Sequence, residues 1–108
     1  MIILNCTPHA VNFLGDDNNI ITTIQPSGII PRVSTTISTV GDINGIPDDV
    51  TSYGEIENLP DYQDGVILIV SALIASAAKN RSDLRVPGRQ VRDSQGHVIG
   101  CKSLSRPC

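Results

Sequence analysis

Short apolar segments separated by turn-forming residues run along most of the chain, a pattern typical of strands. Residues 66–70 form a continuous apolar run rich in β-branched side chains, which predicts a buried strand. Asn44-Gly45 is a tight-turn signal inside a polar, turn-rich segment at 41–49. Further strands are predicted at 2–5, 50–56 and 97–101, with a hairpin across 10–24 and a long extended segment across 29–40.

Residues 71–80 contain helix-forming residues without Gly or Pro, and they predict a short helix. Its side chains are apolar on nearly all sides, with only Ser76 polar in the middle. A helix of this kind is normally buried, and a small monomer has little room to bury it. We therefore expect a homo-oligomer in which small Ala and Ser side chains allow close packing. The alternative is a helix covered by loops of its own domain.

The composition narrows the fold class. Of 108 residues, 31 are Ile, Val or Thr, which favours sheet, and the scarcity of aromatic residues predicts an aliphatic core. The length is that of one domain. The prediction is an α+β fold: a small β-rich single domain over residues 1–108, with one short buried helix and a flexible tail at about 103–108.

The three cysteines, Cys6, Cys101 and Cys108, are odd in number and widely spaced, which predicts free thiols in a reducing compartment. The N-terminal residues lack the features of a signal peptide. The apolar run at 66–78 is shorter than the roughly 20 residues that span a bilayer. We expect a cytoplasmic protein without a membrane partner.

Charge is distributed unevenly along the chain. Before Lys79 there are nine acidic residues and one basic residue, Arg32, whereas from Lys79 onward there are seven basic residues and two acidic ones. The basic segment either neutralises the acidic body or a neighbouring subunit, or it forms an anion site. A nucleic-acid polymer is not the expected partner, because net charge is −3 and no aromatic residue lies among the arginines.

The predicted anion site lies in an arginine-rich loop at 81–95. Arginine makes bidentate contacts with phosphate, so Arg85, Arg89 and Arg92 are the main candidates. Asp93 is expected either to accept from a ribose hydroxyl or to orient Arg92. The alternatives are solvated charges, or pairing of these arginines with Asp83 and Asp93.

Ser71 follows the buried strand at the position of a helix N-cap, where backbone N–H groups need acceptors and phosphate is attracted. It is a candidate ligand, with capping alone as the alternative. Lys79 and Arg81 lie at the opposite helix end, where positive charge complements the helix dipole.

Four residues are secondary candidates for ligand contact. His9 lies at a strand break and can hydrogen-bond a ligand, and Tyr53 is one of three aromatic rings able to stack on a base. Thr7 and Arg32 complete this set.

Catalytic functions remain possible alternatives to ligand binding. Cys6 with His9, and His97 with Cys101, have the residue types of a zinc site or a Cys–His pair. The acidic residues at 55–64 offer carboxylates for a metal or a general base. No catalytic motif is found, so we expect a binding protein without cofactor or metal.

Five sequence blocks form a distinctive set spread over nearly the whole chain. They are Leu4-Asn5-x-Thr7-Pro8-His9-x-Val11-Asn12, Pro26-Ser27-Gly28, Tyr53-Gly54-Glu55-Ile56-Glu57-x-Leu59-Pro60, Ile69-Val70-Ser71, and Pro87-Gly88-x-x-Val91-Arg92-Asp93-x-x-Gly96-x-x-Ile99-Gly100. In these blocks the chain resembles a family of small proteins common in phages and prophages. The tail at 102–108 lies outside the resemblance.

The resemblance implies a phage origin and, by analogy, an anti-defence role. Small phage proteins of this size include sponges, which sequester the nucleotide signals of bacterial immunity, such as cyclic nucleotides, without cutting them. We therefore expect non-catalytic binding of an anionic nucleotide-like molecule in the host cytoplasm. The rivals are a small nucleotide hydrolase and a structural or partner-binding phage protein without a small ligand.

Overall fold

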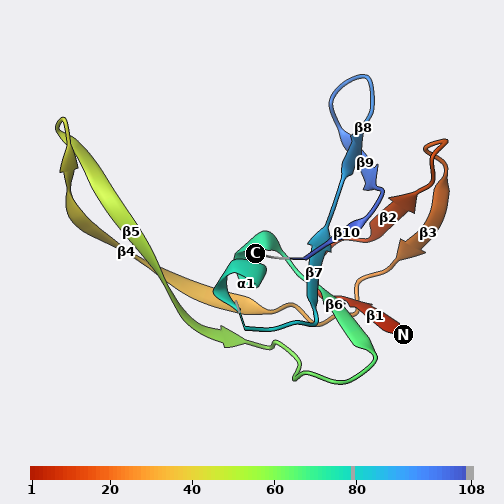
Figure 1. Cartoon of the computed structure of the whole chain (residues 1–108), viewed down its shortest axis with the longest axis horizontal. Helices are drawn as coiled ribbons and strands as arrows, with labels where there is room; N and C mark the ends of the chain where they lie inside the picture. The colour runs from red at the N-terminus through yellow and green to blue at the C-terminus, as the bar shows by residue number, and fades with distance from the viewer. Residues whose placement is uncertain (79, 107–108) are drawn as a thin grey trace.

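The structure is a computed structural model that describes residues 1–78 and 80–106. Lys79, predicted to support the helix end, and Cys108, predicted to be a free thiol, lie outside the described residues. The elements, in chain order, are β1 (Ile2–Asn5), β2 (Val11–Leu14), β3 (Ile20–Ile24), β4 (Arg32–Ile43), β5 (Ile46–Glu57), β6 (Val66–Ile69), α1 (Ala72–Ala77), β7 (Leu84–Pro87), β8 (Gln90–Arg92), β9 (Val98–Cys101) and β10 (Leu104–Ser105) (Figure 1).

The first sheet has the strand order β1-β6-β7-β10 and contains the buried strand. β6 pairs in parallel with β1 and β7, and α1 connects β6 to β7. Leu68 and Val70 pack in one apolar cluster with Ile74 and Leu84, while Ile69 packs in a second cluster. The buried strand is therefore confirmed, and it is apolar on both faces because both faces are covered.

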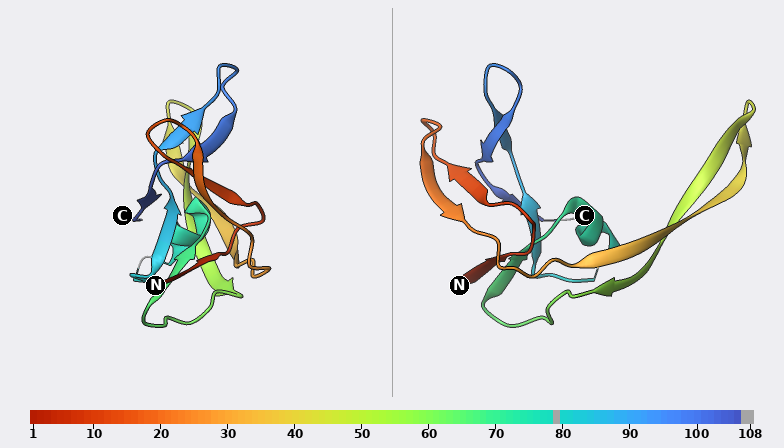
Figure 2. Two further views of the ribbon diagram at one scale, coloured as in Figure 1. Left: turned by 90° about the vertical axis from the view of Figure 1, so that its right-hand side faces the viewer. Right: turned by 180° about the vertical axis from the view of Figure 1, so that it is seen from behind.

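The second sheet has the order β3-β2-β9-β8 and packs beside the first (Figure 2). Phe13 of β2 and Cys101 of β9 are neighbours in the sheet and contact Ile69 of β6. The predicted hairpin at 10–24 and the strand at 97–101 are confirmed as β2–β3 and β9. The mutual core of the two sheets is small and mostly aliphatic.

A glycine allows close approach of β9 to β2. A Cβ atom on Gly100 would lie 2.8 Å from the carbonyl oxygen of Asn12 and 3.0 Å from Cγ of Leu14. We expect Gly100→Ala to lower the free energy of unfolding by about 2 kcal/mol, because the strands must separate to admit the methyl group. Urea denaturation measures this. Gly41→Ala is the matched control, since a Cβ atom there meets nothing within 4 Å; equal losses in both variants would contradict the expectation.

The third sheet is a long two-stranded ribbon, β4–β5, that projects from the rest of the molecule (Figure 1). It turns at Asn44 and Gly45, whose φ angles of 53° and 85° suit a two-residue hairpin turn. The predicted tight turn is confirmed. The prediction that all of 41–49 is turn-rich is wrong, because β4 continues to Ile43 and β5 begins at Ile46. Its acidic residues lie on exposed strands and do not indicate a loop.

The prediction of an arginine-rich loop at 81–95 is also wrong, because this segment contains β7 and β8. Leu84 is buried and Val86 packs against the same cluster, so the segment alternates apolar and polar side chains as a strand does. The tail contributes a strand too: β10 pairs antiparallel with β7 through Leu104 and Ser105. Part of the predicted flexible tail therefore belongs to the first sheet.

The helix α1 is shorter than predicted and is buried on one side. Ile74 and Ala75 face the core, whereas Leu73 is 46% exposed. The helix packs against β7 and the base of the ribbon, so its own domain covers it in part. The prediction of an α+β, strand-rich fold with one short helix is confirmed. In the described residues, no helix is long and apolar enough to cross a membrane.

Candidate functional site

A cleft of about 560 Å³ lies between the first and second sheets. Three of its lining segments lie at or just after the carboxyl ends of the parallel strands β1, β6 and β7, where open α/β sheets bind ligands. Its apolar lining comes from Val11, Val70, Val86, Val98 and Ile99. Its polar lining comes from Thr7, His9, Asn12, Ser71 and Gln90. A mostly apolar surface with a few polar groups is typical of small-molecule sites.

Asn5 holds the segment that carries Thr7 and His9. Its side chain is fully buried and its amide nitrogen donates to the carbonyl oxygens of His9 at 2.8 Å and Ile24 at 3.0 Å. Its Oδ1 accepts from the backbone N–H of Thr7 at 3.0 Å and from the Thr7 hydroxyl at 2.6 Å. One buried amide therefore fixes the turn after β1 and places two predicted site residues at the cleft.

Ser71 acts as the N-cap of α1. Its hydroxyl oxygen accepts from the backbone N–H of Ile74 at 3.3 Å, and its backbone is extended, as a cap requires. The capping alternative is thus what the structure shows. Because a hydroxyl can accept and donate at once, capping leaves the Ser71 proton able to bond a molecule in the cleft.

The three main arginine candidates do not line this cleft. Arg85 donates to the carbonyl oxygens of Ser82 at 2.9 Å and Leu84 at 2.8 Å. Arg89 lies 3.4 Å from the hydroxyl of Ser103, and Arg92 donates to the carbonyl oxygen of Gly96 at 2.8 Å. The structure therefore spreads the guanidinium groups along β7 and the β8–β9 hairpin instead of gathering them at one point.

In the part of the chain that the structure describes, these arginines are not paired with carboxylates either. Over residues 1–78 and 80–106, Arg81 forms an ion pair with Asp83, and Nδ1 of His97 lies 3.6 Å from Oδ2 of Asp93. Asp93 accepts from the backbone N–H groups of Gln95 and His97, both at 2.9 Å, and so orders the hairpin turn. Among the described residues, no hydrogen bond or ion pair joins its side chain to that of Arg92, so neither the predicted pairing nor the predicted orienting contact is seen within this chain.

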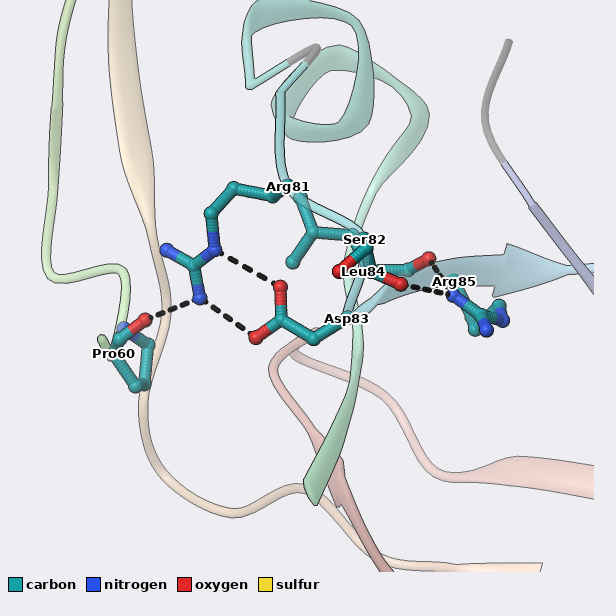
Figure 3. Close-up of polar contacts among 6 residues, drawn as sticks. All are labelled: Pro60, Arg81, Ser82, Asp83, Leu84 and Arg85. Carbon is teal, nitrogen blue, oxygen red and sulfur yellow. Dashed lines mark hydrogen bonds and ion pairs between the residues drawn. The ribbon is translucent and has the colours of Figure 1, made fainter. Parts of the chain in front are cut away.

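Arg81 has a different role from the predicted one (Figure 3). Its guanidinium forks onto the carboxylate of Asp83, at 2.9 Å and 2.7 Å, and donates to the carbonyl oxygen of Pro60 at 2.7 Å. Asp83 is only 3% exposed. The ion pair therefore ties the helix exit to the loop before β6, and its hydrogen bonds hold the pKa of Asp83 below the ordinary value.

The lowered pKa of Asp83 predicts a pH dependence of stability. The folded state favours the carboxylate, so this contribution is complete above the unfolded pKa, about 4, and is lost as pH falls toward the folded pKa. We expect the free energy of unfolding of the native protein to exceed that of Asp83→Asn at neutral pH. The gap should narrow below about pH 4 in urea titrations. A gap that stays constant down to pH 2 would contradict this origin.

Two secondary candidates lie on the ribbon, away from the cleft. Arg32 lines a smaller hollow of about 260 Å³ together with Glu55 and Glu57. Tyr53 lies opposite Thr35 and is 42% exposed. Within one chain, neither residue can join Thr7, His9 and Ser71 at the cleft.

The catalytic alternatives find little support in the described part of the chain. Cys6 and Cys101 are free and buried, and burial raises the pKa of both thiols, which favours the unreactive protonated form. Cys6 lies near the Ser27 hydroxyl, and Cys101 near the carbonyl oxygen of Asn12. Among residues 1–78 and 80–106, no three His, Cys, Asp or Glu side chains are grouped to hold a metal.

Sequence reasoning missed Asn5, Asn12 and Gln90. Asn12 and Gln90 line the cleft, and Asn5 positions its neighbours. Asn5 had a signal: an isolated polar residue at the end of an apolar strand, two residues before Thr7 and in a specific block. Gln90 had none, because it stood inside the segment interpreted as an arginine loop.

Neither family models, nor curated proteins, nor solved structures provide a match to this chain. The site must therefore be interpreted from its own geometry.

Proposed function

We propose that the protein binds a nucleotide-like small molecule in the cleft and sequesters it without chemical change. The observation that carries the proposal is the composition of the cleft at the strand ends. An apolar surface suits a base and ribose, while Thr7, His9, Asn12, Ser71 and Gln90 offer donors and acceptors around it. The volume of about 560 Å³ is within the range of small-molecule sites.

Under this proposal the phosphates lie at the rim and not inside the cleft. Arg89 directly precedes Gln90, and Arg92 follows two residues later, about 7 Å along the strand. A guanidinium has five N–H donors, and the described contacts of Arg92 use one of them, to Gly96. An arginine this close to Gln90 along the chain can therefore reach an anionic group while the nucleoside part fills the cleft.

The resemblance to small phage and prophage proteins supports the biological setting. A sponge needs affinity for its ligand and no catalytic group, and the cleft offers hydrogen-bonding side chains and apolar surface for that purpose. We therefore propose an anti-defence protein that removes an immune signalling nucleotide, such as a cyclic nucleotide, from the host cytoplasm.

A thermal-shift panel of cyclic dinucleotides, cyclic mononucleotides and ADP-ribose-type molecules tests the proposal. A ligand at 100 times its Kd stabilises by about 2.7 kcal/mol, which raises the Tm of a domain of this size by roughly 10 °C. His9→Ala and Gln90→Ala should weaken the shift for the same ligand. The matched control is Gln63→Ala, on an exposed loop away from the cleft.

The fate of the ligand separates the three candidate functions. Heat release followed by mass spectrometry should return the molecule unchanged. A cleaved product would instead identify a hydrolase. No stabilisation by any member of the panel would favour a structural or partner-binding protein and contradict this proposal.

A further inference from the structure

The ribbon β4–β5 gives the molecule an extended shape. The radius of gyration is 16.7 Å, whereas a compact domain of this length has about 13 Å. The accessible surface is 7372 Å², whereas a monomeric protein of 11.5 kDa exposes about 5,800 Å². The difference, roughly 1,500 Å², is more than the 800 Å² or so that each partner buries in a stable protein interface. The exposed surface of this chain is therefore large enough to include an interface with another subunit.

The ribbon also exposes apolar side chains that a solitary hairpin does not need. Ile37, Ile43 and Ile46 are between 62% and 68% exposed, and Val40, Val50 and Tyr53 are exposed as well. A two-stranded hairpin without a third strand or a covering element is marginally stable in water. We therefore expect another surface to cover the exposed apolar residues of the ribbon.

Charge indicates where that surface lies. The outer half of the ribbon carries Asp42, Asp48 and Asp49 and no basic residue. Arg85 lies on β7, Arg89 between β7 and β8, and Arg92 on β8. Figure 1 shows the tip of the ribbon at the left and the β8–β9 hairpin projecting from the body, well apart from it. The described ion pairs connect neither group to the other. The complementary charges can therefore meet only between two copies.

We infer that the ribbon of each copy docks on the β7–β9 surface of a second copy. Its isoleucines would cover exposed apolar side chains of the cleft wall, such as Val98, which is 48% exposed, and Ile99, which is 40% exposed. Its aspartates would pair with the arginines. If the exchange is reciprocal, one twofold axis relates the copies and each contributes a ribbon and a receiving surface. The cleft of each copy is then bordered by the ribbon of its partner.

This inference goes beyond the proposed function and does not depend on a ligand. Its test therefore uses ligand-free protein after extensive dialysis, and measures molar mass by size-exclusion chromatography with light scattering. The native chain should give a mass of at least twice 11.5 kDa. A mass of one chain at the highest soluble concentration would overturn the inference while leaving the ligand proposal intact.

A shortened ribbon provides the first variant. Removing residues 39–43 and 46–49 joins the paired residues Ser38 and Val50 through the existing Asn44-Gly45 turn. The body should remain folded, as judged by circular dichroism and a cooperative melt, and the mass should fall to that of a single chain. An unchanged oligomer with the shortened ribbon would contradict the docking role.

Charge reversal provides a second variant that leaves the backbone intact. Asp48→Lys with Asp49→Lys should raise the dissociation constant of the oligomer at least tenfold, and adding Arg89→Glu with Arg92→Glu should restore association. Asp61→Lys with Asp64→Lys is the matched control, because it makes the same charge change in an exposed loop. An equal effect of the control, or no rescue, would reject pairing between these groups.

Discussion

Arg81→Met is expected to lower the free energy of unfolding by about 3 kcal/mol, because it leaves a buried carboxylate without its partner. Asp83 is 3% exposed and receives both of its side-chain hydrogen bonds from Arg81. The same guanidinium also satisfies the carbonyl oxygen of Pro60, so the substitution loosens the loop before β6. Equilibrium urea denaturation at neutral pH measures the loss.

Arg85→Met is the matched control for this experiment. It removes the same charged group four residues away, from a side chain whose described contacts are backbone carbonyl oxygens. We expect it to cost less than about 1 kcal/mol. The double variant Arg81→Met, Asp83→Leu should recover part of the loss, since apolar residues tolerate the site better than one buried charge. Equal losses for Arg81→Met and Arg85→Met would contradict the importance of the ion pair.

Asn5→Leu is expected to cost about 3 kcal/mol and to reduce ligand binding. The buried amide makes four hydrogen bonds, and an apolar side chain of similar size leaves the N–H of Thr7 and the carbonyl oxygens of His9 and Ile24 without it. The turn after β1 then loses its fixed shape, so His9 is no longer held at the cleft. Urea denaturation and the thermal shift with a bound ligand measure the two effects.

Thr7→Val separates these effects from a simple loss of polarity. It removes the hydroxyl that can donate to Asn5 or to the carbonyl oxygen of His9, and it keeps the two hydrogen bonds of the Asn5 amide nitrogen, so it should cost about 1 kcal/mol. If Asn5→Leu costs no more than Thr7→Val, the buried amide does not organise the site.

Strands and turns could be predicted where the local sequence pattern alone determines the structure. The run at 66–70 is apolar on both faces, and Asn44-Gly45 has the conformational freedom for a two-residue turn, so both were interpreted correctly. β7 and β8 were missed, because four arginines and a Pro-Gly pair outweighed the alternation of Leu84 and Val86. β7 pairs with β6 across the intervening helix, and β8 pairs with β9 across the turn at 93–97, and propensity within one strand does not report such contacts.

The site was predictable only in part for the same reason. Thr7, His9 and Ser71 were chosen from local features, and the parallel pairing of β1 with β6 brings them together. Arg85, Arg89 and Arg92 were expected to converge because they are close in sequence. On extended strands, close residues point to different sides and spread over a distance, so the arginines separate.

The most direct test of the central claim is native mass spectrometry of the protein purified from cells challenged with phage, where immune nucleotides are made. The account predicts a bound species of nucleotide mass, released intact on denaturation and lost in the variant His9→Ala with Gln90→Ala. Ligand retained equally by this variant and the native protein, or a native protein that binds no nucleotide at any concentration tested, would contradict the assignment of the cleft.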